Sequence, residues 1–202
     1  MFYNKHNLNL KNFTNASKLE LNGILIESNA TVATDSCIMI KVSEPAFNKN
    51  EIPMSANKQP INPPGQFPAF LIPTEIADKL IKNLPMSKTL PILNNAIMTK
   101  SQQYTADFYI NDLQSSQTIT AIKQECQFPK YKEIFARTNN NHTKIKVNVE
   151  LLQKITNYFK NFVKNNELII SINSKDINNP IKFEGKGDNE QTATALLMPI
   201  KN

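Results

Sequence analysis

The sequence has few of the residues on which disulfides, metal sites and base-specific DNA contacts depend. Cys37 and Cys126 are the only cysteines among 202 residues, too few and too far apart for a zinc motif or a disulfide framework. We expect both to be reduced thiols in a cytoplasmic protein. Arg137 is the only arginine. Because bidentate contacts to guanine are mostly made by arginine, base-specific reading of DNA is not expected.

Long apolar runs and catalytic clusters are also missing. No run of about 18 apolar residues occurs, so no membrane span is expected. The polar segment 1–11 does not resemble a signal peptide. His6 and His142 lie in asparagine-rich stretches, with no nucleophile or metal ligand placed nearby. The sequence therefore predicts a protein that is not an enzyme, with no catalytic residues, no metal site and no cofactor.

What is present is an ordinary globular composition with an excess of lysine. Hydrophobic residues make up 40% of the chain and charged residues 20%, which disfavours wholesale disorder. The formal net charge of +6 suits a partner such as duplex DNA without requiring one. Because lysine acts toward phosphate as a point charge, we expect any DNA contact to be non-specific and salt-sensitive.

A helix followed by three strands is predicted twice along the chain. The first helix starts at Pro73-Thr74-Glu75 and ends near Pro85, and the second is capped by Asn148. The predicted strands are 90–98, 104–110 and 118–122 after the first helix, and 168–172, 181–183 and 194–198 after the second. A third, weaker copy has strands at 19–27, 31–34 and 37–42, with few apolar residues to form its helix. The predicted class is α+β, with repeats of one helix plus a small antiparallel sheet.

Two segments are predicted as linkers between these copies. They are the proline-rich stretch 43–67 and the asparagine-rich stretch 135–143. The predicted domains are 1–136, with two helix-sheet units, and 137–202, a half-domain that ends in Met-Pro-Ile-Lys.

Three short segments carry a resemblance to a known family. They are Val32-Ala33-Thr34-Asp35-Ser36, the segment Gln127 to Ile134 (QFPKYKEI), and the terminal segment Leu196 to Asn202 (LLMPIKN). Their order and spacing resemble the bacterial sliding clamp, the beta subunit of DNA polymerase III. In that family a strand ends in Ala-Thr-Asp, a Phe-Pro-Asp-Tyr segment joins the second domain to the third, and the chain stops at Met-Pro-Met-Arg-Leu. The three pieces converge there on one peptide-binding cleft.

The resemblance covers residues 19–202 and is strongest from Phe70 onward. Three units are counted here, whereas a bacterial clamp protomer has six. The chain therefore resembles the second clamp domain plus half of the third. The family usually has Gly-His-Arg-Leu after the aspartate, but this chain has Ser36-Cys37-Ile38-Met39, which implies a more apolar cleft wall. Lys130 replaces the usual aspartate.

The resemblance implies a set of residues for the peptide-binding cleft. They are Thr34, Ser36, Cys37, Met39, Pro129, Lys132, Ile134, Leu196, Met198, Pro199, Ile200 and Lys201. Simpler roles stay open: Asp35 forms a turn, Pro129 and Tyr131 anchor a linker, and the tail completes a sheet. The cleft would take a short extended peptide with one or two large apolar residues.

A second set of residues consists of lysines on or near the predicted helices. They are Lys79, Lys82, Lys88, Lys154, Lys160 and Lys164. In a clamp the helices line the hole, so the resemblance implies loose, sequence-independent contacts between these lysines and phosphates. The alternative is an ordinary solvated helix face.

Three functions remain open from the sequence. The first is a cytoplasmic DNA-replication and processivity accessory that binds duplex DNA non-specifically and tethers a DNA polymerase or another clamp-binding peptide protein. Known rings hold twelve units, so three per chain would require a homo-oligomer of four chains by analogy. The second is a monomeric adaptor or decoy of mobile-element or phage origin, with the cleft kept and the ring lost. The third is a small enzyme whose site is not visible in the sequence.

Overall fold

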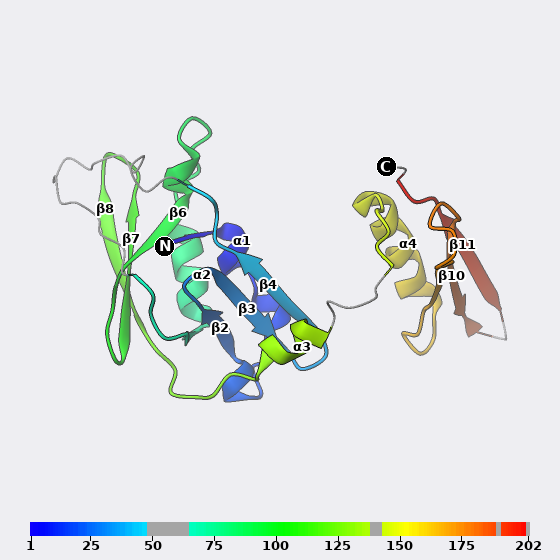
Figure 1. Cartoon of the computed structure of the whole chain (residues 1–202), viewed down its shortest axis with the longest axis horizontal. Coiled ribbons are helices and arrows are strands. Elements are labelled where there is room, and N and C mark those ends of the chain that lie inside the picture. The colour runs from blue at the N-terminus through cyan, green and yellow to red at the C-terminus, as the bar shows by residue number, and fades with distance from the viewer. Residues whose placement is uncertain (48–64, 138–142, 189–190, 201–202) are drawn as a thin grey trace. The chain divides into compact units, whose positions relative to one another are not determined.

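The structure, a computed structural model, describes residues 1–47, 65–137, 143–188 and 191–200 (Figure 1). The chain divides into a first unit, Met1–Pro129, and a second unit, Lys130–Asn202. Most of the predicted linker 43–67, and residues 138–142 of the other one, lie outside the described residues.

The first unit contains two repeats of the order strand, helix, three strands. The first repeat consists of β1 (Phe2–Asn4), α1 (Lys5–Leu8), β2 (Gly23–Ile26), β3 (Ala30–Thr34) and β4 (Met39–Ser43). The second consists of β5 (Phe70–Pro73), α2 (Thr74–Asn83), β6 (Asn95–Ser101), β7 (Thr105–Asn111) and β8 (Ser116–Ile122). Short 3-10 helices occupy Lys11–Phe13, Leu19–Leu21 and Pro91–Asn94. The predicted helix at Thr74 and the predicted strands 104–110 and 118–122 are confirmed. The predicted strand 90–98 is wrong in its first half, because Pro91–Asn94 form a 3-10 helix and β6 begins only at Asn95. Strand β1 was not predicted.

The two repeats exchange a strand with each other. The sheets have the orders β1-β6-β7-β8 and β4-β3-β2-β5, so each repeat supplies the fourth strand of the other repeat's sheet. Both exchanged strands are antiparallel to their new neighbour, with Ile72 opposite Ile24 and Phe2 opposite Ile97. Each also runs directly into the helix of its own repeat. The exchange makes the two repeats one folding unit, because neither sheet is complete without the other repeat.

The core of the first unit lies where the two helices meet the two sheets. Tyr3, Ile24, Ile72, Leu80 and Phe108 are each 0% exposed, and Figure 1 shows α1 and α2 side by side. The Tyr3 hydroxyl donates to the Glu27 carbonyl oxygen at 2.9 Å. Burial, with the Glu44 and Glu27 charges, raises the pKa of Tyr3 well above its ordinary value. Tyr3 therefore acts as a neutral donor.

Helix α1 is only one turn long, as the scarcity of apolar residues in this region suggested. Asn4 caps it by accepting from the backbone N–H groups of His6 and Asn7 at 2.8 and 3.2 Å. Asn7 is fully buried, and its Nδ2 donates to the carbonyl oxygens of Val42 and Ser43 at 3.3 and 2.9 Å. The Asn4 side chain therefore caps the turn, and the Asn7 side chain holds it against β4.

The second unit contains one further repeat. Its elements are α3 (Tyr131–Arg137), α4 (Val149–Phe162), β9 (Ile169–Ser171), β10 (Ile181–Lys186) and β11 (Thr192–Leu197), with the sheet order β11-β10-β9. Helix α4 packs Phe159 against Ile181, Phe183 and Leu197 of the sheet. The predicted cap is confirmed, because Asn148 Oδ1 accepts from the backbone N–H of Leu151 at 3.1 Å.

Helix α3 corrects the prediction that residue 135 begins a linker. The rings of Tyr131 and Phe135, four residues apart, meet edge to face with centroids 6.1 Å apart, and this spacing stabilises a helical turn.

The predicted apolar face of α4 is only partly covered, since Leu151 and Tyr158 are 45% and 57% exposed.

Candidate partner groove and lysine face

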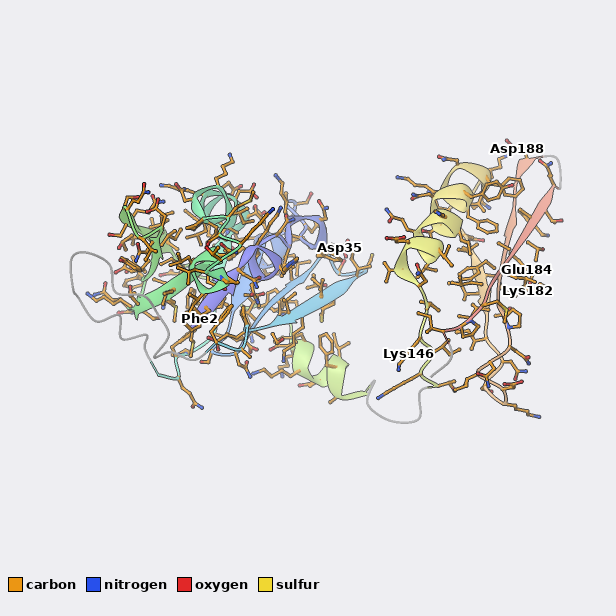
Figure 2. All side chains as sticks on the ribbon, turned by 90° about the horizontal axis from the view of Figure 1, so that it is seen from above. Phe2, Asp35, Lys146, Lys182, Glu184 and Asp188 are labelled. Atoms are coloured by element: carbon orange, nitrogen blue, oxygen red, sulfur yellow. The ribbon has the colours of Figure 1, made fainter. Side chains whose placement is uncertain are left out.

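The turn after β3 holds the first of the motif segments. Thr34 is buried, and its Oγ1 donates to the Ile38 carbonyl oxygen at 2.7 Å. Asp35, which is labelled in Figure 2, accepts through Oδ1 from the backbone N–H groups of Cys37 and Ile38 at 2.7 and 2.8 Å. Both bonds lower the pKa of Asp35, and the bond from Ile38 has the larger effect. The bonds therefore stabilise the turn fully when the pH is above the ordinary carboxyl pKa of 3.8. This stabilisation is lost as the pH falls through the lowered pKa of Asp35 and the carboxylate is protonated.

Ser36 adopts φ 87°, in the left-handed region that favours glycine. The resembling clamp sequence has glycine at this place, so the turn keeps a glycine-like backbone although the residue differs. Ser36 and Cys37 are exposed and Met39 is half-buried.

Changing Ser36 to glycine is therefore expected to stabilise the first unit. Relief of the left-handed strain, partly offset by the greater chain entropy of glycine, predicts a gain of about 0.5–1 kcal/mol in the free energy of unfolding. Urea denaturation measures it. Ser17→Gly is the control, because Ser17 is exposed and has no positive φ, and it should be neutral or slightly destabilising. A Ser36→Gly protein less stable than the wild type would contradict this account of the turn.

The segment leading to Pro129 returns to the same end of the sheet as the Asp35 turn. Gln124 donates from its backbone N–H to the Leu71 carbonyl oxygen at 2.9 Å, and from Nε2 to the Asn22 carbonyl oxygen at 3.3 Å. Asn22 directly precedes β2, and the antiparallel neighbour β3 ends at Thr34. Pro129 itself is half-buried.

The other predicted cleft residues belong to the second unit. On α3, Lys132 is exposed, with Nζ 5.8 Å from the centroid of the Tyr131 ring, and Ile134 is 50% exposed. On and after β11, Leu196 and Met198 are 63% and 58% exposed. Lys201 lies outside the described residues.

Two of the predicted tail residues line a hollow of about 690 Å³, which we call the tail groove. Its lining residues are Lys144, Ile145, Lys146, Ile177, Asn178, Pro199 and Ile200. The backbone N–H of Ile200 donates to the Lys146 carbonyl oxygen at 2.8 Å, which fixes the tail beside the segment that precedes α4. Leu196 and Met198 do not line the groove.

Five of the seven residues that line the tail groove were not predicted from the sequence. The segment Lys144 to Val147 alternates charged and apolar residues directly before the Asn148 cap, which is the pattern of a half-buried strand. Residues 145–148 directly precede α4, as Phe70–Pro73 directly precedes α2. That signal could have identified Lys144, Ile145 and Lys146, whereas nothing in the sequence points to Ile177 or Asn178.

The predicted DNA-contacting lysines are all exposed. Those on helices are Lys79 and Lys82 of α2 and Lys154 and Lys160 of α4, while Lys88 and Lys164 lie beyond the helix ends. Lys164 Nζ pairs with Asp188 at 3.7 Å. Helix α2 also carries Glu75 and Asp78, so its two lysines are balanced by two acids.

Helix α1 and the 3-10 helix after it add two exposed lysines that were not predicted. They are Lys5 and Lys11, and Lys11 Nζ lies 3.3 Å from Asp78 Oδ2 of α2. With them, the helix side of the first unit is weakly positive. We call the exposed lysines Lys5, Lys11, Lys79 and Lys82 the lysine face.

Other kinds of site find little support in the structure. Across residues 1–47, 65–137, 143–188 and 191–200, no three His, Cys, Asp or Glu side chains gather as metal ligands would. In the same ranges, every helix is too short or too polar to cross a membrane.

Comparisons with known proteins give matches among solved structures. No protein-family model and no curated protein matches the sequence. The DNA polymerase sliding clamp from Pseudomonas aeruginosa matches with a TM-score of 0.63 at 13% identity, over 100% of this chain and 51% of that one. The beta subunit from the DNA polymerase of Streptococcus pyogenes matches with 0.60 at 11%, over 100% and 50%. The DNA polymerase III beta subunit from Thermotoga maritima matches with 0.56 at 13%, over 91% and 43%.

These identities are low, so the likeness concerns the fold. The chain spans about half the length of the clamps it matches. The α+β class and the resemblance stated from the three motif segments are confirmed at this level. The chain has the fold of the bacterial sliding clamp, the beta subunit of DNA polymerase III, over a length equal to about half of one clamp chain.

Proposed function

We propose that this protein is a sliding-clamp-like accessory of DNA replication in the cytoplasm. It binds partner proteins through a peptide in the tail groove, and it contacts duplex DNA non-specifically through the lysine face and the lysines of α4. The observation that carries the proposal is the tail groove itself, which lies at the end of a clamp-like repeat and is lined by Pro199 and Ile200. The proposal gives the chain a binding role and no catalytic one.

The lining of the groove defines the ligand. Ile145, Ile177 and Ile200 offer apolar surface, while Lys144 and Lys146 offer positive charge. The volume falls within the range of about 300–1,000 Å³ typical of ligand sites. An extended peptide with one or two large apolar side chains and a neighbouring acid fits this chemistry. The lysines at the rim favour the acid, although an exposed charge pair contributes only about 0–1 kcal/mol.

Peptide binding tests the proposal. A fluorescent peptide with leucine and phenylalanine anchors and one aspartate is titrated with the protein, and anisotropy gives the Kd. Ile200→Ala is expected to raise the Kd about tenfold or more, the usual effect of truncating an anchor contact in a pocket. Leu196→Ala is the matched control, because Leu196 is exposed in the same unit but lies outside the groove; its Kd should stay within about twofold of wild type, well under a hot-spot effect. Absence of binding, or equal effects of the two changes, would overturn the groove as the partner site.

DNA binding should depend on salt through the lysine face. The slope of log K against log salt falls by about 0.9 for each phosphate contact removed, so Lys79→Ala with Lys82→Ala is expected to reduce the slope by about 1.8. The control is Lys100→Ala with Lys175→Ala, since both residues are exposed and lie outside the helices. Equal slopes for the two double variants would show that the helices are not the DNA-binding face.

A further inference from the structure

In the part of the chain that the structure describes, the sheet of the second unit has three strands, whereas each sheet of the first unit has four. In the first unit the fourth strand always pairs with the strand that opens the three-strand run, β2 or β6. The strand in that position in the third repeat is β9. Among the described residues, β9 pairs with β10 alone and forms one edge of its sheet.

Exposure shows that this edge lacks the cover that its counterparts have. Ile24 and Ile26 of β2 are 0% exposed, whereas Ile169 and Ile170 of β9 are 65% and 54% exposed. The start of α4 is also less covered than the start of α2. Val149 is 74% exposed at the first position of α4, where Thr74 of α2 is buried. Adjacent exposed isoleucines on a sheet edge are an unusual surface for a protein that stays alone, because such an edge invites pairing with another strand.

The strand that could be donated is already in position within the third repeat. In the second repeat, Leu71 of β5 accepts from the backbone N–H of Gln124, which follows that repeat's last strand. In the third repeat, Lys146, which is labelled in Figure 2, accepts in the same way from Ile200, which follows β11. Leu71 and Lys146 each stand three residues before the first residue of their helix. Residues 144–148 therefore occupy the place of β5.

We propose that two copies of this chain complete each other by exchanging the segment 144–148, each segment adding to the β9 edge of the other copy. The register follows from the first unit, in which the residue directly before the helix lies opposite the first residue of the receiving strand: Pro73 opposite Gly23, and Asn4 opposite Asn95. Asn148 of one copy then lies opposite Ile169 of the other, and Lys146 lies opposite Ser171. The second unit becomes one half of an intermolecular domain.

A second copy is the occupant that the molecule itself favours. The third repeat carries both the open edge and the segment that fills such an edge, so one two-fold axis satisfies both copies at once. The two repeats of the first unit already do this within one chain. The main chain does not have to rearrange for this exchange. The Lys146 carbonyl group that accepts from Ile200 corresponds to the Leu71 carbonyl group of β5, which accepts from Gln124 on the side away from the receiving strand β2.

The mass in solution tests the proposal. Light scattering at micromolar concentration should give twice the chain mass of 22.9 kDa. Ile170→Lys places a charge on the β9 edge and should return the mass to that of one chain. It should leave the fold intact, because Ile170 is 54% exposed. Ile122→Lys is the matched control: Ile122 is 70% exposed on β8, an edge strand of the first unit. That variant should remain a dimer. A wild-type monomer, or a dimer broken by Ile122→Lys and not by Ile170→Lys, would overturn the proposal.

Cross-linking tests the register. With Cys37 and Cys126 changed to serine, Lys146→Cys with Ser171→Cys should form a disulfide-linked dimer under mild oxidation, because paired residues on neighbouring strands lie within disulfide reach. Lys146→Cys with Ile169→Cys is two residues out of register and should cross-link far less. Equal cross-linking of both pairs would contradict the register. The proposal does not depend on peptide binding, so a peptide-binding monomer would leave the proposed function standing and remove only the dimer.

Discussion

Replacing Phe159 by alanine is expected to unfold the second unit and leave the first unit folded. Phe159 is 1% exposed and is the one described residue of α4 that is fully buried, against Phe183 and Leu197 of the sheet. Truncating a buried phenylalanine costs about 3–5 kcal/mol. A single small core rarely supplies more than about 3–5 kcal/mol in total, so the change consumes most or all of the stability of this unit.

Limited proteolysis with mass spectrometry measures this result. The Phe159→Ala protein should be cut throughout residues 143–200 while a fragment near residues 1–129 survives. Tyr158→Ala is the matched control, because its ring is the neighbouring aromatic on the same helix and is 57% exposed. That variant should keep the wild-type cleavage pattern. Loss of both units together in Phe159→Ala would show that they fold as one and would contradict the division at Pro129.

Replacing Ile72 by alanine is expected to destabilise both repeats of the first unit together. Ile72 belongs to the second repeat by sequence, but it lies opposite Ile24 in the sheet of the first repeat and is 0% exposed. The cavity and the lost apolar contacts predict a loss of about 2–5 kcal/mol in the free energy of unfolding. Because the exchanged strand joins the two sheets, the loss should not be confined to either repeat.

Urea denaturation followed by NMR at separate amides can distinguish the two cases. The midpoints for amides in β3 and in β7 should fall by the same amount in Ile72→Ala. The same change at Ile122, which is 70% exposed on β8, should leave both midpoints nearly fixed. It should change the free energy of unfolding by no more than the roughly 0.5 kcal/mol typical of surface positions. A midpoint that falls in one of these two strands but stays fixed in the other would mean that β5 does not hold the two repeats together.

The helices and strands with strong local signals could be predicted from the sequence. The apolar spacing from Ile76 to Leu80 located α2, and Asn148 identified the start of α4. The three strands after each of these helices follow from short apolar runs between polar residues. Such signals act within a few residues of the chain, so one sequence is enough to locate them.

The strand exchange could not be predicted in the same way. Phe2 pairs with Ile97 across most of the first unit, and nothing in either short strand specifies so distant a neighbour. Helix α1 was weak in the sequence because side-chain hydrogen bonds from Asn4 and Asn7, and not an apolar stripe, hold it in place. Pairing over long distances and buried polar contacts depend on the whole fold.

The candidate site was predicted only in part, because it too combines segments that lie far apart in the chain. The resemblance pointed to Pro199 and Ile200, which line the tail groove. The opposite wall comes from Lys144 to Lys146, more than fifty residues earlier in the chain, and is brought there by the bond between Ile200 and Lys146. That the Asp35 turn, Pro129 and Lys132 share this groove stays a prediction.

The measurement that tests the account most directly is hydrogen–deuterium exchange of β9 compared with β2 and β6. Among the described residues one repeat occurs three times; its sheet is completed twice within the chain and, in the proposed exchange, once by another copy. At high dilution, the β9 amides that face away from β10 should exchange far faster than those of β2 and β6, and at high concentration they should slow toward the same rates. Equally slow exchange of all three strands at high dilution, or fast exchange of β9 at every concentration, would contradict it.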